Sequence, residues 1–347
     1  MEETNQLLES VDCGYLTSTE QKNLFTEKQL IIILKQKAEN IQSIETLSSY
    51  YLRFLKQAHR GDFSYYEEIA QEKEEVKTIL EQCVNYKFYI RYLEIWRYAS
   101  PFFFDRGYWK DFEFYSKKAC GIANIIGAWQ EQARCLIEEL SWLYYWQGEF
   151  QQEEKVLFQA EHILEQKADT YLQALCQLRK GLLCKSNSRF AEADKYLTQA
   201  HRYFKNIDNP DLLSKSALYL GQLRQAQKQY DNAEKHYKSA LKYGKRTDNE
   251  NEAKALYYLG AIHFQTKRAL SARHYFSEAL QIDQKNHRIA GFGWNYYGLA
   301  CAESGETQKN LAFAASECFS NLKMNDQAHM SKLLIKNNTT KSLFELP

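Results

Sequence analysis

The sequence predicts an all-α fold, a right-handed solenoid of helical repeats that follows an N-terminal helical segment. Only 3 prolines and 14 glycines occur among the 347 residues, too few turn-forming residues for a β-sandwich or a β-barrel. Apolar residues recur at spacings of three and four in most segments, as on the buried face of a helix. Segments of similar sequence also return at a regular interval, which is the signature of a repeat architecture.

The composition indicates a sizeable core and restricts the possible partners. Hydrophobic residues make up 44% of the chain and aromatic residues 14%, which excludes a disordered chain. The 45 basic and 44 acidic residues leave a net charge of +1, which disfavours duplex DNA and anionic membranes. No apolar run approaches the roughly 18 residues of a membrane-spanning helix. We therefore expect no nucleic-acid partner and no membrane insertion.

Cysteine usage and the first residues favour a cytoplasmic location. The 8 cysteines include no C-x-x-C pair, and several lie in helical apolar patterns, where a free cysteine packs as a small hydrophobe. The stretch MEETNQLLESVDCGYL is acidic and lacks the basic and apolar regions of a signal peptide. We expect a reducing compartment.

Residues 1–92 are predicted to form the N-terminal helical segment. In SSYYLRFLKQAHRG, residues 48–61, apolar residues recur at three- and four-residue spacing. This pattern is typical of an amphipathic helix.

Residues 93–323 are predicted to form about six helix pairs that repeat every 38 to 41 residues or so. The clearest copies are KSALYLGQLRQAQKQYDNAEKHYKSALKYG (215–244) and KALYYLGAIHFQTKRALSARHYFSEALQID (254–283). Their alignment pairs small and aromatic residues, namely Gly221 with Gly260, Ala233 with Ala272, Tyr237 with Phe276 and Ala240 with Ala279. Gly181 takes the same place in an earlier copy, and Gly298 takes it in a weaker sixth copy. Short polar breaks (RG, QG, NS, QK, TK and SG) separate the two helices of each pair.

Gly260 needs an explanation, because a glycine inside a helix costs roughly 1 kcal/mol relative to alanine. Its recurrence at the same place in each copy favours a contact point at which the two helices of a repeat meet. A large side chain there would hold the helices apart. The alternative is that a ligand approaches the backbone at this position.

These positions resemble the signature of the tetratricopeptide repeat family, a small residue after leucine in the first helix and Ala, aromatic, Ala in the second. The helix-ending proline of that family is missing, and the repeat exceeds its usual length. In this respect it looks like the long repeats of kinesin light chains and of bacterial signalling proteins. The segment before the repeats looks like the helices that precede the sensor repeats of STAND-type signalling ATPases. The nucleotide-binding pattern G-x-x-x-x-G-K-[ST] is, however, absent from this sequence.

The sequence predicts no enzyme activity, no metal site and no cofactor. The 8 histidines are scattered, and neither an H-E-x-x-H motif nor a Cys/His cluster with zinc spacing occurs. A G-x-S-x-G elbow, a dinucleotide-binding glycine pattern and a kinase signature are also absent.

The resemblance implies that the first helix of each repeat lines a concave groove. The inward positions of these helices then give a candidate partner-binding set, Arg97, Phe104, Glu138, Trp142, Tyr145, Trp146, Tyr257 and Phe264. Its aromatic members are of the kind that anchors a peptide or a helix. The alternative is that they pack between adjacent helices or against the N-terminal segment, because SWLYYWQ is apolar around nearly the whole helix.

Two local features complete the prediction. Pro101 lies in the first helix of its repeat, and we expect it to kink that helix or delay its start. Residues 324–347 lose the repeat pattern and are predicted to form a capping helix and a flexible tail.

The sequence therefore predicts a non-catalytic adaptor or scaffold that binds a peptide or helix of another protein. The alternative is a regulatory receptor whose superhelix changes shape when a short peptide or a small ligand binds.

Overall fold

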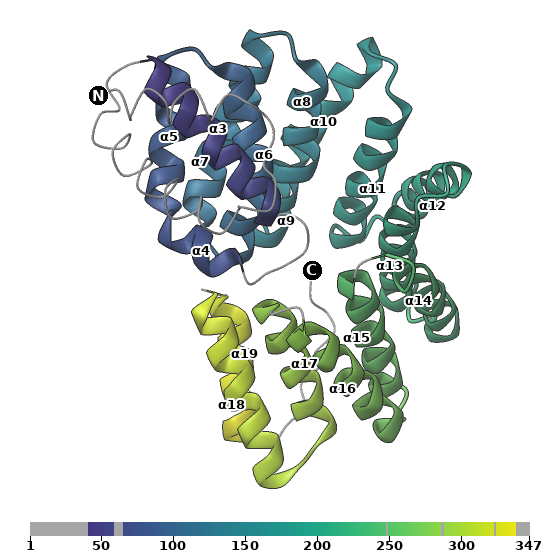
Figure 1. Ribbon diagram of the computed structural model, residues 1–347. Coiled ribbons are helices and arrows are strands. Elements are labelled where there is room, and N and C mark those ends of the chain that lie inside the picture. Colours follow the sequence, from purple (N-terminus) through teal and green to yellow (C-terminus); the bar gives the residue numbers. More distant parts are fainter. Residues whose placement is uncertain (1–40, 59–64, 248, 286–287, 323, 338–347) are drawn as a thin grey trace.

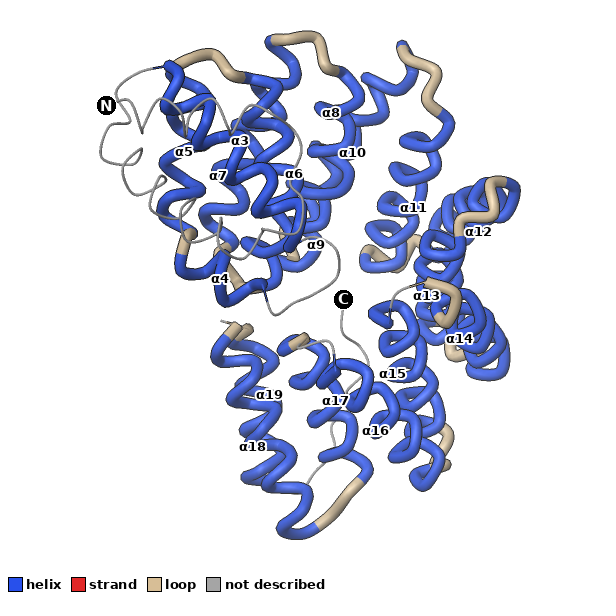
Figure 2. Tube along the Cα trace, viewed as in Figure 1, coloured by secondary structure: helices blue, strands red, loops and turns tan. Residues whose placement is uncertain are grey.

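The computed structural model describes residues 41–58, 65–247, 249–285, 288–322 and 324–337. Within these ranges every regular element is a helix, and turns connect the helices (Figure 2). Residues 1–40 of the predicted N-terminal segment and residues 338–347 of the predicted tail lie outside the described part of the chain.

In the described part of the chain, three helices come first and six helix pairs, which form the repeats, follow them. The first three are α3 (Ile41–Ala58), α4 (Tyr65–Gln71) and α5 (Lys73–Asn85). The first pair is α6 (Tyr89–Asp105) with α7 (Trp109–Ile125). In the second pair the first helix consists of three consecutive parts, α8 (Trp129–Arg134), η1 (Cys135–Leu140) and α9 (Ser141–Gln147), and the second helix is α10 (Phe150–Gln166). The other pairs are α11 (Thr170–Ser186) with α12 (Phe190–Asn206), α13 (Pro210–Ala226) with α14 (Tyr230–Gly244), α15 (Asn249–Gln265) with α16 (Ala269–Lys285), and α17 (Ile289–Ala302) with α18 (Gly305–Asn321). The helix α19 (Asn325–Asn337) packs on α18. The predicted all-α solenoid is confirmed.

The glycines of the repeats lie where the two helices of a pair meet. A Cβ atom at Gly221 would stand 2.4 Å from the ring of Tyr237, and one at Gly260 would stand 2.7 Å from the ring of Phe276. Contacts below 3.0 Å are essentially never made by real Cβ atoms. The packing explanation for Gly260 is therefore confirmed.

The sixth copy is packed in a different register from the one expected. Gly298 faces Phe276 of the preceding repeat, whereas Gly293 faces Phe319, which belongs to the second helix of its own pair. The helix α17 has 14 residues, fewer than the 17 of α15. The contacting aromatic is also placed differently, because Phe276 is the eighth residue of α16 whereas Phe319 lies near the end of α18, where Ala312 is the eighth residue.

The polar breaks form tight turns with one residue in the left-handed region. Gly107 and Gly148 have φ values of 71° and 72°, and Ser188, Lys228 and Lys267 adopt φ values of 58°, 61° and 60° at the equivalent places. Glycine takes such angles without strain, whereas other residues take them at a cost. The turn geometry is therefore shared by repeats whose turn sequences differ.

The helix α6 runs across residues 92 and 93, so the N-terminal helices and the first repeat share a continuous element. It begins at Tyr89 and contains Pro101, so the expected delay of its start is wrong. The buried residues Trp96, Phe102 and Phe103 lie on either side of the proline. Their packing overrides the local cost of a proline in a helix interior. The division of the chain at residues 92/93 and 323/324 stays a prediction.

The array curves until its ends meet (Figure 1). The first helices of consecutive pairs contact one another, as α13 contacts α15 and α15 contacts α17, so they line the inner face of the curve. At the ends, a Cβ atom at Gly107 would stand 2.7 Å from the carbonyl oxygen of Leu322. The turn between α6 and α7 thus lies directly against the end of α18.

Candidate functional site

Four of the predicted residues form one aromatic cluster. Trp142, Tyr145 and Trp146 lie on one face of α9, since residues three and four apart in a helix are neighbours, and Phe104 joins them from α6. The Trp142 ring is stacked on Tyr145 with centroids 5.5 Å apart and on Phe104 with centroids 6.3 Å apart. Trp146 meets Trp142 edge to face at 5.6 Å. We call these four residues the aromatic cluster.

The aromatic cluster is only partly buried. Tyr145 is 4% exposed and belongs to the core, whereas Trp142, Trp146 and Phe104 keep part of their surface accessible. Trp146 also packs against the hydrophobic cluster of the C-terminal repeats. Packing between helices therefore accounts for Tyr145, while Trp142 retains surface that a ligand can cover.

Tyr257 and Phe264 lie with the C-terminal repeats on α15. Tyr257 contacts Phe276 and Trp294 with ring centroids 5.5 and 6.2 Å apart. Phe264 packs against the same C-terminal hydrophobic cluster as Trp146. The structure brings Phe264 and Trp146 to one cluster, while Tyr257 packs among the side chains of its own and the next repeat.

Arg97 and Glu138 have other surroundings. Arg97 of α6 forms an ion pair with Glu131 of α8, which already neutralises its charge. Glu138 lies in the η1 turn. The pKa of Tyr171 is raised chiefly by burial of its phenol, and the negative charge of Glu138 raises it further. Neither residue has a described ring or hydrogen-bond contact with the aromatic cluster.

Two cations beside the aromatic cluster, Arg179 and Lys185, were not among the residues predicted from the sequence. The Arg179 guanidinium carbon lies 4.1 Å from the centroid of the Trp142 ring, a cation–π contact. The Lys185 ammonium lies 3.5 Å from the Tyr145 hydroxyl and 3.4 Å from the Gln222 side-chain oxygen. Burial lowers the pKa of Lys185 to about 8. Both cations come from α11, one repeat beyond the aromatic cluster, where the sequence gives no local signal.

Charged residues from distant helices also approach one another inside the curve. The Tyr66 hydroxyl of α4 donates to Asp105 at 3.0 Å. Although Asp105 is exposed by area, its desolvation by surrounding protein and the nearby Glu250 raise its pKa to about 7. Lys254, which pairs with Glu250, and Arg288 act on the same carboxyl. Residues of the first and the fifth and sixth pairs thus share one electrostatic environment.

The second pair contains two buried carboxylates, Glu139 and Glu153. Its first helix contains the π-helical turn η1, and π-turns are frequent at functional sites. Glu139 in this turn accepts from the Trp96 indole at 2.8 Å and pairs with Arg134 at 2.9 Å. Glu153 of α10 is fully buried, and burial raises its pKa to about 8.

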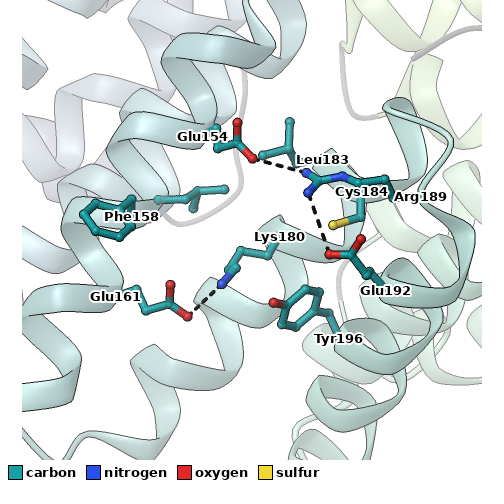
Figure 3. Close-up of a pocket in the computed structure, with 10 residues that line it drawn as sticks. Glu154, Phe158, Glu161, Lys180, Leu183, Cys184, Arg189, Glu192 and Tyr196 are labelled. Atoms are coloured by element: carbon teal, nitrogen blue, oxygen red, sulfur yellow. Dashed lines mark hydrogen bonds and ion pairs between the residues drawn. The ribbon is translucent and has the colours of Figure 1, made fainter.

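An outer pocket between α10, α11 and α12 offers little for recognition (Figure 3). Lys180 pairs with Glu161 at 2.7 Å, and Arg189 pairs with Glu154 at 3.3 Å. Arg189 also pairs with Glu192 at 3.7 Å, so each of the two cations that line the pocket already has a carboxylate partner. Within the described residues, no group of three or more His, Cys, Asp or Glu residues is placed to hold a metal ion.

Comparison with known proteins identifies the repeats. Residues 212–285 match the family model described as tetratricopeptide repeat. Residues 212–285 therefore form tetratricopeptide repeats. A comparison with curated protein sequences found no match. Among the described helices, none is long and apolar enough to cross a membrane.

Solved structures share this tetratricopeptide fold at low sequence identity. A Rap protein complexed with Competence and Sporulation Factor aligns over 97% of this chain and 98% of its own, with a TM-score of 0.58 and 13% identity. Aspartyl phosphate phosphatase F from Bacillus subtilis aligns over 96% of this chain and 91% of its own, with a TM-score of 0.54 and 15% identity. A signal transduction ATPase with numerous domains from Pyrococcus horikoshii, which has a tetratricopeptide repeat sensor, covers 75% of this chain with a TM-score of 0.53 and 16% identity. This chain spans only 42% of that ATPase. Such identities support the fold alone.

Proposed function

We propose that this chain binds a peptide or helix of a partner protein on the inner face of its tetratricopeptide array, without catalysing a reaction. The observation that carries the proposal is the aromatic cluster, because Trp142 presents a partly exposed ring that Tyr145, Phe104 and Arg179 hold in place. Fixed aromatic rings are frequent anchors in protein interfaces. Helical repeat arrays use their concave surfaces for such binding.

The proposal is tested with a library of random hexapeptides incubated with the purified chain, the bound peptides being identified by mass spectrometry. Trp142→Ala is the test variant and Phe158→Ala the matched control, since Phe158 is 70% exposed on the second helix of the same pair. We expect the wild type and Phe158→Ala to retain the same peptides and Trp142→Ala to lose them by about tenfold or more. Equal retention by both variants, with unchanged circular dichroism, would refute the inner-face assignment.

A second candidate function is a regulatory receptor whose superhelix changes shape on binding. The contact of Gly107 with Leu322 favours it, because a ligand that fits only an open or only a closed array would shift the balance between them. The Rap structure is a complex with another factor, which is compatible with this candidate. Small-angle scattering with and without a selected peptide separates the two: an adaptor keeps its radius of gyration, and a receptor changes it.

A further inference from the structure

The second helices of the third and fourth pairs, α12 and α14, share a pattern of basic residues. In both helices the residues two, nine and twelve positions after a buried alanine, Ala193 or Ala233, are basic. These residues are Lys195, Arg202 and Lys205, and Lys235, Lys242 and Lys245. All six are exposed. We call them the basic rows.

The adjacent second helices do not share this pattern. The equivalent positions are Lys155, His162 and Glu165 in α10, and His274, Gln281 and Gln284 in α16. The positive charge is therefore local to the third and fourth pairs and is not a property of the repeat itself. The chain as a whole has a net charge of only +1, so this surface differs from the average of the molecule.

The charges of the basic rows are hardly balanced within the protein. Among the described residues, Lys245 alone approaches a carboxylate, that of Glu252 at 4.0 Å. Asp194 of α12 pairs instead with Arg224 of α13. The other five cations of the basic rows thus face solvent without a carboxylate partner in the described part of the chain.

The two rows belong to one outer surface. Both helices lie on the outside of the curve (Figure 1). Burial lowers the pKa of His236 on α14, and the charges of Arg224 and of His201 on α12 lower it further, so charges on the two helices act on each other. From Lys195 to Lys205 a row extends about 15 Å along its helix. The surface is thus compact and lies away from the inner face.

The electrostatics of the helices accounts for only part of the basic rows. Cations in or directly after the last turn are favoured by the helix macrodipole, which explains Lys205, Lys242 and Lys245. Lys195 and Lys235 lie in the first halves of their helices, where the macrodipole gives them no support. An acidic ligand would interact favourably with all six.

We propose that the basic rows bind an acidic segment, rich in Asp and Glu, of a second partner protein. This inference goes beyond the proposed function, because it leaves the inner face free and gives an adaptor a separate surface for another protein. Complementary charges of this kind accelerate association and select the partner.

Two observations favour an acidic protein segment over a nucleic acid. The rows are short, and Glu165 occupies a row position on the adjacent helix α10, so a long polyanion would meet negative charge beside them. Every aromatic ring of Phe or Tyr on α12 and α14 is buried or only partly exposed. Single-stranded nucleic acids are usually held by stacking on exposed rings.

The test measures fluorescence anisotropy with the full chain and two labelled peptides of about ten residues, long enough to cross both rows. One peptide alternates glycine with glutamate, and the other alternates glycine with glutamine. The test variant combines Lys195→Gln, Arg202→Gln, Lys235→Gln and Lys242→Gln. The matched control makes the same change of net charge at exposed lysines elsewhere, and combines Lys110→Gln, Lys155→Gln, Lys167→Gln and Lys332→Gln.

We expect the wild type and the control to bind the glutamate peptide at least about tenfold more tightly than the test variant does. The affinity should fall when salt is raised from about 50 to about 200 mM, since exposed charges are screened. Trp142→Ala should bind this peptide as the wild type does, because Trp142 lies on the inner face. Circular dichroism checks that each variant is folded.

Four results would overturn this inference. They are no binding of the glutamate peptide, equal binding of the two peptides, equal affinities of the test and control variants, and tighter binding of a single-stranded oligonucleotide with the same number of charges. The last would make a nucleic acid the ligand of the basic rows. Loss of the glutamate peptide in Trp142→Ala would also contradict it, because the peptide would then bind on the inner face.

Discussion

At the residue scale, the repeat glycines show which helix contacts can be predicted from the similarity between the repeats. The recurrence of Gly181, Gly221 and Gly260 predicted a close approach of two helices, and the structure places a side chain of the partner helix against each of them. Lys185 and Arg179 could not be found in the same way. Their contacts with Trp142 and Tyr145 come from another helix pair, and such neighbours leave no pattern in the sequence.

The glycine contacts lead to a stability prediction for Gly260→Ala. The new methyl group would stand 2.7 Å from the Phe276 ring, so overpacking outweighs the gain of about 1 kcal/mol in helix propensity. We expect a net loss of about 1 to 2 kcal/mol in the free energy of unfolding, measured by urea denaturation. Gly121→Ala is the matched control, because a Cβ atom at Gly121 of α7 meets nothing within 4 Å. It should gain stability, and equal effects of the two changes would contradict the packing argument.

At the element scale, the second helix pair differs from its neighbours in ways that the repeat pattern did not predict. The expected inward positions assume a regular helix, but η1 interrupts the helix between Trp129 and Gln147. Buried Glu153 also stands where the aligned repeats have Ala193, Ala233 and Ala272. A π-turn depends on packing around the helix and has no simple sequence signature. The aromatic cluster was nevertheless predicted, since residues 142, 145 and 146 share a face within the regular part of α9.

Glu153 makes the stability of this pair depend on pH. Its folded pKa of about 8 lies above the ordinary value of 4.5, so the unfolded chain releases this proton first. The contribution is fully favourable below about pH 4.5 and is lost as pH rises towards 8. At pH 8.5 we expect Glu153→Gln to be more stable than the wild type by about 1 to 3 kcal/mol, with a much smaller gain at pH 5.

Chemical denaturation at the two pH values measures this difference. Glu154→Gln serves as the control, because the Glu154 side chain is 61% exposed and pairs with Arg189 at the surface. It should show little change at either pH. A pH-independent gain in Glu153→Gln would mean that Glu153 is ionised in the folded protein.

At the scale of the whole molecule, the contact between the two ends of the array could not be predicted from the sequence. Repeat patterns describe how each pair packs on its neighbour, whereas the meeting of the ends depends on small rotations summed over all pairs. The contact of Gly107 with Leu322 and the packing of Trp146 against the C-terminal hydrophobic cluster result from that sum.

The closing contact can be tested with two matched glycine variants. Gly107 and Gly148 have nearly the same positive φ, so alanine strains both turns to a similar extent. Only at Gly107 would the new methyl group also collide with the Leu322 carbonyl. We expect Gly107→Ala to enlarge the radius of gyration in small-angle scattering, while Gly148→Ala leaves it unchanged. Identical scattering from the two variants would argue against contact of the ends in solution.

The meeting of Gly107 and Leu322 also fixes how many repeats this chain can carry. An open solenoid tolerates the gain or loss of a terminal repeat, because each unit touches only its neighbours. Here, removing one internal helix pair would carry the end of α18 away from the turn after α6, and adding one would drive the ends into each other. Natural variation in length should therefore be confined to surface turns, while the number of helix pairs stays constant.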